Sequence, residues 1–150
     1  MKSNEMKKYV IVSGFFNPLH EGHLKMFEEA KKLGKHLIVI VNNDKQQLLK
    51  KGKIIMSELE RLRIIKALKM VDTARLAFDE DGTVVNTLEY YGKVFKGSGL
   101  VFANGGDRKD KETVPETKIC EEYKIEMVFG VGGFEKTNSS SNINKLRGAE

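Results

Sequence analysis

Short apolar runs alternate along the chain with segments whose apolar residues recur every three or four positions. Runs of this length, rich in β-branched and aromatic residues, predict buried strands. There are five of them: YVIVSG at 9–14, HLIVIVNN at 36–43, TARLAF at 73–78, LVFAN at 100–104 and IEMVFGVGG at 125–133. Strands that alternate with helices over short connections predict one parallel sheet with helices on both faces, an α/β fold.

The segments between the runs have the spacing and end signals of helices. The segment at 57–71 has the strongest pattern, because Ser57 and Glu60 fit a capping box. Its expected inner face is Leu59, Leu62, Ile65, Leu68 and Met70. We expect the first helix to end at Gly34 as a C′ glycine. The five predicted helices are 21–34, 57–71, 83–95, 114–124 and 139–147.

Glycines, histidines, asparagines and serines gather where the predicted strands end. The segments that follow four of the strands read GFFNPLHEGH, NNDKQQLLKKGK, NGGDR and GVGGFEKTNSSS, and we expect them to be loops. In an open α/β sheet, ligands bind outside the carboxyl ends of the strands. This edge of the sheet is therefore the predicted site.

Length and charge narrow the class of protein. The 150 residues predict one domain at 9–150 after a flexible stretch at 1–8. The net charge of +5 suits an anionic partner, and a small phosphorylated ligand fits it. We expect no nucleic-acid partner, because the chain lacks an arginine-rich tail or an aromatic platform. Without a long apolar run or a secretory signal, and with a lone Cys120, we expect a cytoplasmic protein without a membrane partner.

The segment after the first strand carries the most distinctive chemistry. Gly14 is expected to let the chain turn tightly, and His20 and His23 lie three apart at the start of a helix, so both can face one side. Free N–H groups at a helix N-terminus favour a phosphate, and Gly22 leaves room for a ligand between the imidazoles. We expect no metal site, because no cysteine, third histidine or carboxylate motif completes a zinc set. Two ordinary surface histidines are the alternative.

The order of the motifs resembles the cytidylyltransferase-like nucleotidyltransferase superfamily. GFFNPLHEGH is similar to its G-x-F-[DN]-x-x-H-x-G-H signature. Four further elements occur in the family's order, from about Tyr9 to Leu146: the lysines 50, 51 and 53, Arg61 in an E-x-R helix, NGGDR at 104–108 and SSSNI at 139–143. The resemblance implies a Rossmann-like fold and an enzyme that joins a phosphate monoester to the α-phosphorus of a nucleoside triphosphate, releasing pyrophosphate.

The resemblance also implies roles for individual residues. His20 and His23 would stabilise the reacting phosphate, Lys50 or a neighbouring lysine would neutralise phosphate charge, and Arg61 would add a permanent charge. Asp107 would bind ribose or help to hold Mg²⁺, which is expected to bridge triphosphate oxygens largely without a protein cage. The expected nucleotide-binding residues are Gly14, Phe15, Phe16, Asn17, Gly22, Asn104, Gly106, Asp107, Arg108, Ser139, Ser140 and Ser141.

The chain departs from known branches of the superfamily. Lys136 is the only cation shortly before the serines, where many cytidylyltransferases have an arginine, and the R-x-x-G-I-S-T-T string of the glycerol-3-phosphate enzymes is absent. The GGD turn and the SSSNI ending are closer to heptose-1-phosphate adenylyltransferases. We expect CTP as donor and a polyol or sugar phosphate as acceptor. An ATP-using adenylyltransferase and a non-catalytic nucleotide sensor are the alternatives, and the oligomeric state, including a homodimer, stays open.

Overall fold

The computed structural model describes residues 7–105 and 114–132. Five strands and five helices form in these residues. In chain order they are β1 (Lys7–Gly14), α1 (Glu21–Lys31), β2 (Gly34–Val41), α2 (Asp44–Lys51), α3 (Glu58–Lys66), β3 (Thr73–Leu76), α4 (Val85–Val94), β4 (Leu100–Gly105), α5 (Thr117–Glu122) and β5 (Glu126–Val131).

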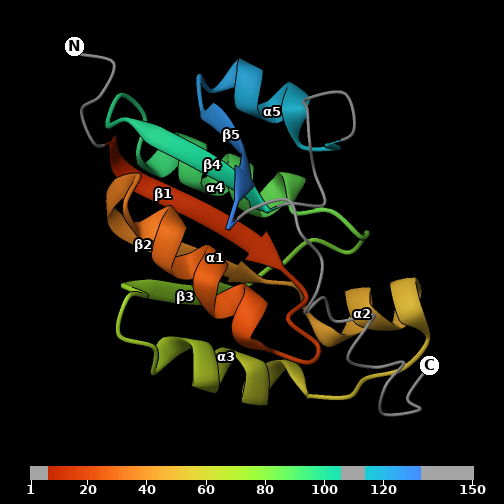
Figure 1. Cartoon of the computed structure of the whole chain (residues 1–150). Coiled ribbons are helices and arrows are strands. Elements are labelled where there is room, and N and C mark those ends of the chain that lie inside the picture. The colour runs from red at the N-terminus through yellow and green to blue at the C-terminus, as the bar shows by residue number, and fades with distance from the viewer. Residues whose placement is uncertain (1–6, 106–113, 133–150) are drawn as a thin grey trace.

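The five strands make one parallel sheet in the order β3-β2-β1-β4-β5, which confirms the predicted fold class (Figure 1). The first strand lies at the centre, so its carboxyl end is flanked by β2 on one side and β4 on the other. The chain crosses back to this centre only once, between β3 and β4. The change of direction places the segment after β1 at the topological switch point of the sheet, where ligands bind in such folds.

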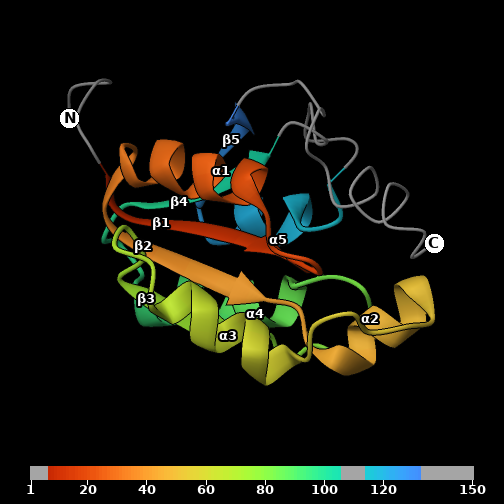
Figure 2. The ribbon, with the colours of Figure 1, turned by 60° about the horizontal axis from the view of Figure 1, so that its bottom comes forward.

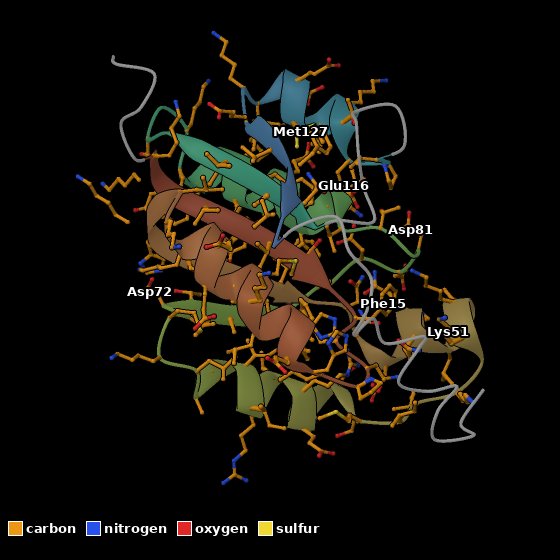
Figure 3. All side chains as sticks on the ribbon, viewed as in Figure 1. Phe15, Lys51, Asp72, Asp81, Glu116 and Met127 are labelled. Carbon is orange, nitrogen blue, oxygen red and sulfur yellow. The ribbon has the colours of Figure 1, made fainter. Side chains whose placement is uncertain are left out.

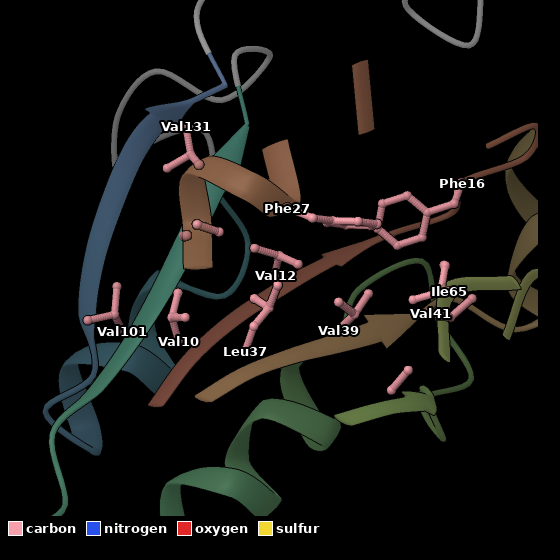
Figure 4. Close-up of a cluster of buried hydrophobic side chains, with 13 residues drawn as sticks. Val10, Val12, Phe16, Phe27, Leu37, Val39, Val41, Ile65, Val101 and Val131 are labelled. Carbon is pink, nitrogen blue, oxygen red and sulfur yellow. The ribbon is translucent and has the colours of Figure 1, made fainter. Parts of the chain in front are cut away.

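Alternate side chains of the central strands enter two separate cores. Val10 and Val12 point to one face and Ile11 to the other, as the period of two in a strand requires. Phe27 of α1 and Ile65 of α3 cover the first face (Figure 4), whereas α4 and α5 cover the second. Figure 2 shows α1 and α4 on opposite sides of the sheet. Because both faces are covered, β1 and β2 are apolar along their length and not alternating.

Two predicted boundaries are wrong. The segment at 44–51, predicted as a loop, is the helix α2, which begins after the N-cap Asn43 and ends at Gly52 with φ 75°. Gly34 does not terminate α1. It is the first residue of β2, where a Cβ would come within 2.9 Å of a Val10 methyl, so glycine is needed there for close packing of two strands. The sheet also begins at Lys7, so the last two residues of the stretch expected to be flexible belong to β1.

The inner face of α3 also differs from the prediction. Leu59 is 68% exposed, whereas Arg61 is fully buried together with Ile65. Leu62, Leu68 and Met70 pack against the first core as expected. The hydrophobic pattern could not identify this face, because a buried arginine counts as polar. The Ser57 side chain does cap the helix by accepting the Glu60 N–H at 3.2 Å.

The predicted last helix at 139–147 lies outside the described residues. Within 7–105 and 114–132, none of the helices has the length and apolar content needed to cross a bilayer.

Adjacent isoleucines on α3 test the position of the first core. Ile65 is fully buried and Ile64 is 37% exposed. Ile65→Ala should lower the free energy of unfolding by about 2–4 kcal/mol, because it removes buried methyl groups and leaves a cavity. Ile64→Ala, the matched control, should cost less than about 1 kcal/mol. Urea denaturation measures both values, and equal losses would contradict the assigned orientation of α3.

Candidate functional site at the carboxyl edge of the sheet

The segment 15–20 links β1 to α1 at the carboxyl edge of the sheet. Gly14 has an ordinary backbone conformation, so the expected tight turn does not explain it. A Cβ on Gly14 would lie 2.8 Å from the ring of Phe16. Glycine is needed because that ring folds back over the end of β1 into the core, helped by a φ of 53° at Phe16.

His20 and His23 hold each other in place through the helix end. His20 is the N-cap of α1, and its Nδ1 accepts the Gly22 N–H at 3.0 Å. The His20 N–H donates in turn to Nδ1 of His23 at 3.2 Å. Two imidazoles thus make the reciprocal bonds of a capping box, a role usually taken by Ser or Thr with Glu or Gln.

These bonds fix where each ring carries its proton. A nitrogen that accepts a hydrogen bond has no proton of its own, so Nδ1 is bare in both rings and the neutral form carries its hydrogen on Nε2. Burial, with a smaller contribution from the nearby His20, lowers the pKa of His23 to about 3. Burial also lowers the pKa of His20. At neutral pH the pair is therefore two uncharged Nε2–H donors.

The rings are too close for the ligand position expected from the sequence. Their centroids are 3.8 Å apart with planes tilted by 31°, so nothing fits between them. The helix N-terminus is also less open than expected, because the Gly22 N–H is bonded to a ring and the His23 N–H to the His20 carbonyl. The donors left to the pair are the Nε2–H groups, and Nε2 of His20 is buried without a hydrogen-bond partner.

Phe16 packs against His23 of the histidine pair. Its ring is 3% exposed and packs edge-on against His23, with centroids 5.0 Å apart, and against Phe27. The close-up of the core shows Phe16 reaching back toward Phe27 (Figure 4). The expectation that Phe16 contacts a nucleotide is corrected accordingly, because a ring in the core contributes by fixing the imidazole above it.

Arg61 joins three segments beside this pair. Its side chain is fully buried. Nη1 donates to the carbonyl oxygens of Phe15 at 2.6 Å and Asn42 at 2.7 Å, and Nε donates to that of Met56 at 2.9 Å. Nη2 pairs with the carboxylate of Asp44 at 2.8 Å. The ends of β1 and β2 and the start of α2 are thus bound to one guanidinium.

This geometry changes the role expected for Arg61. The sequence suggested a charge that contacts phosphate, or a surface pair with Glu58 or Glu60. The structure shows neither, because the guanidinium donates to protein oxygens on all three nitrogens and is sealed from solvent. The guanidinium of Arg61 is therefore engaged by protein oxygens that shape the loop.

The helix α2 brings lysines to the same edge. Lys50 is exposed, and its Nζ lies 4.6 Å from the centre of the Phe15 ring, a cation–π distance. Phe15 and the end of α2, marked by Lys51, lie on the same side of the molecule in Figure 3. Lys50 therefore lies close to the first loop, as expected. Lys50 and Lys51 are, however, on the helix α2 and not on a loop.

Asn17 links the first loop to the start of α3. Its Oδ1 accepts the Met56 N–H at 2.6 Å, and its side chain is 6% exposed. Its Nδ2 is buried and has no partner. Asn17 therefore fixes the loop through one atom and keeps a second, unpaired donor next to the histidines in sequence.

The nucleotide-binding residues expected beyond β4 are only partly described. Asn104 is buried, and its Nδ2 lies 3.3 Å from the Val128 carbonyl oxygen of the neighbouring strand. Gly106, Asp107 and Arg108, together with Ser139, Ser140 and Ser141, lie outside the described residues. In residues 7–105 and 114–132, no three His, Cys, Asp or Glu side chains gather as a metal-binding group.

Comparison with known proteins identifies the family to which this chain belongs. A model of the cytidylyltransferase-like family matches residues 11–142, which include β1 to β5. The chain belongs to the cytidylyltransferase-like family. A solved relative supports the same fold: the lipopolysaccharide core biosynthesis protein from Thermoplasma volcanium is 31% identical, with a TM-score of 0.64 over 83% of this chain and 94% of that one.

Two curated relatives of this cytidylyltransferase-like chain match over part of their length. An FAD synthase of Ferroglobus placidus is 49% identical over 76 residues, 51% of this chain and 49% of that protein. The bifunctional protein HldE of Actinobacillus succinogenes is 38% identical over 114 residues, 67% of this chain and 24% of that protein. The matched segments thus span about half of one relative and a quarter of the other.

Sequence reasoning missed the contribution of α2 to this cytidylyltransferase-like site. Gln46 at position N3 accepts the Asn43 N–H at 2.9 Å, while Asn43 accepts the Gln46 N–H at 2.9 Å. The pattern N-x-x-Q followed by a glycine after Lys51 is the start and stop signal of a short helix. That signal could have identified α2. No pattern could have identified Asp44 as the partner of Arg61, because 17 residues separate them.

Replacing Arg61 should destabilise the whole cytidylyltransferase-like domain. Arg61→Met leaves three carbonyl oxygens without a donor and the Asp44 carboxylate without its cation, so we expect a loss of about 3–5 kcal/mol in the free energy of unfolding. Arg63→Met on the exposed face of α3 is the matched control and should change it by less than about 0.5 kcal/mol. If urea denaturation finds Arg61→Met as stable as the control, the positioning role is wrong.

The histidine pair should make folding sensitive to acid. The pKa of His23 is about 3 in the folded protein against an ordinary 6.5, so between these pH values the unfolded chain binds the extra proton. Stability is therefore lost as the pH falls from about 6.5 toward 3. His23→Asn should show a shallower fall in the free energy of unfolding over this window. Identical slopes in urea titrations of the two proteins would contradict the buried neutral imidazole.

Proposed function

We propose that this protein is a nucleotidyltransferase, in which a phosphate monoester attacks the α-phosphorus of a nucleoside triphosphate and pyrophosphate leaves. The bond formed is between an acceptor phosphate oxygen and the α-phosphorus, and the bond broken is the one to the β-phosphate bridging oxygen. The observation that carries the proposal is the pair His20 and His23, locked through Nδ1 so that both Nε2–H groups are donors.

Neutral imidazoles suit this chemistry. The transition state spreads negative charge over the α-phosphate and the leaving oxygen, and donors that are fixed beforehand stabilise it without reorganising. The low pKa of His23 means that it acts as a hydrogen-bond donor and not as a cation or a general base at neutral pH. Phe16 behind His23 and the reciprocal bonds with His20 supply the rigidity that such donors require.

Positive charge for the phosphates comes from the lysines at the end of α2 and just after it. Lys50, Lys51 and Lys53 are all exposed, and Lys50 lies over the Phe15 ring beside the first loop. A flexible ammonium can move from an aromatic face to a phosphate oxygen. Arg61 has no part in charge neutralisation in this proposal. It sets the path of the loop through the Phe15 carbonyl and thereby the position of the histidines.

We further propose ATP as the donor, in place of the CTP expected from the sequence. Several relatives carry the name FAD synthase, and the adenine dinucleotide in that name is made by joining an adenylyl group to a flavin phosphate. The match to the FAD synthase of Ferroglobus placidus covers 51% of this chain. CTP is the competing donor, and a sensor that binds nucleotide without turnover is the competing class.

The triphosphate itself would hold Mg²⁺. Mg²⁺ is usually bound through substrate phosphates and one or two carboxylates. When bound, the ion would neutralise charge on the departing pyrophosphate. No protein ligand is assigned to it.

A pyrophosphate-release assay tests the proposal. With Mg²⁺, each of the four nucleoside triphosphates and a panel of phosphate monoesters, we expect release with ATP and at least one acceptor. Release only with CTP would overturn the donor assignment, and no release from any pair would favour the sensor.

The assay also tests the imidazoles. His23→Ala should lower turnover by roughly 10²-fold or more, because it removes a fixed donor to the developing charge. His36→Ala is the matched control. His36 lies at the amino end of β2, away from the site, with Nε2 2.7 Å from Thr73 Oγ1, so its loss should leave turnover within about twofold. Near-normal turnover in His23→Ala would remove His23 from the mechanism.

A further inference from the structure

Three buried side-chain atoms in the described part of the chain have no hydrogen-bond partner. They are Nδ2 of Asn17, Nε2 of His20 and Oε1 of Gln47. Two of them lie in the loop between β1 and α1, and the third lies on α2. Unpaired buried polar atoms are rare because each costs free energy, so a concentration of them calls for an explanation.

Gln47 lies on α2 between two residues that are linked to the first loop. Asp44, one turn before it, binds Arg61, which in turn donates to the Phe15 carbonyl. Lys50, one turn after it, lies over the Phe15 ring. Residues three apart on a helix are neighbours, so Gln47 shares a helix face with both of them. Its side chain is 3% exposed.

We propose that Gln47 is a specificity residue, whose Oε1 accepts a hydrogen bond from a hydroxyl group of the phosphorylated acceptor. This inference rests on the proposed function. A carbonyl oxygen needs a donor, and an ionised phosphate offers only acceptors, so the partner is a hydroxyl on the body of the acceptor. The acceptor class is therefore a phosphate monoester of a polyhydroxylated molecule, such as a polyol, a sugar or the ribityl chain of a flavin.

The strand order favours the acceptor over the nucleotide at this position. α2 follows β2, on one side of the central β1, whereas Asn104, one of the expected nucleotide-binding residues, lies in β4 on the other side. The two substrates must meet at the histidines from opposite directions for in-line transfer. The substrate that meets α2 is then the acceptor, with its phosphate toward the lysines and its hydroxyls toward Gln47.

The unpaired oxygen is shielded from water in the ligand-free protein. A hydroxyl can reach it only after a neighbouring side chain turns aside, and Lys50 is the exposed, flexible group one turn away on the same helix. Keeping an unpaired oxygen in the free protein costs stability, and binding a hydroxyl recovers it. The retained glutamine thus favours acceptors with a hydroxyl over those without one, because the latter leave the oxygen unpaired.

Kinetics with paired acceptors test this assignment. The panel contains glycerol 3-phosphate, glucose 1-phosphate and FMN, which carry hydroxyls, and n-propyl phosphate, which carries none. Gln47→Met should raise KM for the preferred hydroxylated acceptor by about tenfold, with KM for ATP and for n-propyl phosphate unchanged. Leu49→Met on the exposed face of α2, where the side chain is 65% exposed, is the matched control and should change none of these values.

A second variant distinguishes an acceptor role of Gln47 Oε1 from a donor role of the Gln47 amide nitrogen. Gln47→Glu keeps the acceptor oxygen, so it should retain binding of the hydroxylated acceptor far better than Gln47→Met. If Gln47 instead donates to the phosphate through its amide nitrogen, Glu would weaken binding more than Met does, and the inference would be overturned. A change confined to KM for ATP, or equal use of n-propyl phosphate by the wild type, would overturn it too.

Stability provides a readout that does not depend on turnover. Gln47→Met removes an unpaired buried oxygen, so it should raise the melting temperature of the free protein by about 2 °C. Glycerol 3-phosphate, glucose 1-phosphate or FMN should raise the melting temperature of the wild type more than that of this variant. A melting temperature lowered by several degrees would show that Gln47 is structural. If none of the three stabilises the wild type, the inference fails. Binding without pyrophosphate release would instead contradict only the proposed function.

Discussion

The buried guanidinium of Arg61 is the contact on which the site depends. It binds the carbonyl oxygens at the ends of β1 and β2 and the carboxylate at the start of α2. Removing an arginine from water costs several kcal/mol, and this cost is offset only where every donor finds a partner. Because the partners belong to three segments, their relative positions are fixed by one planar group. The loop that carries the histidines and the helix that carries the lysines are therefore placed by the same residue.

The histidines illustrate a second constraint, in which local structure determines chemistry. His20 caps α1, and the cap bonds occupy Nδ1 of both rings. Burial then keeps the rings neutral by lowering the pKa of each. The outcome is a pair of aligned donors that require no proton transfer before they act. A site built this way suits a reaction whose main demand is stabilisation of charge on phosphate, where covalent catalysis by the protein has no role.

The sequence predicted the fold well and the site unevenly. Strand positions and the parallel arrangement follow from the apolar runs, because a strand covered on both faces must be apolar along its length. The histidine pair was identified because two histidines three residues apart are unusual in a connecting loop. Phe16 and Arg61 were assigned to a ligand and belong to the interior instead. Residue type shows what a side chain can bind, but its burial depends on segments distant in the sequence.

What the sequence alone determined is local: the five strands, four of the five described helices and the motif at the end of β1. Tertiary structure decided the rest. It placed Asp44 and Phe15, which lie 17 and 46 residues from Arg61, on one guanidinium. It also buried the Gln47 side chain and left its Oε1 unpaired. These features depend on how α2 packs against the neighbouring loops, and packing between distant segments leaves no periodic signal in the chain. The physical reason is that periodicity reports one element's own buried face, whereas a site is formed where several elements meet.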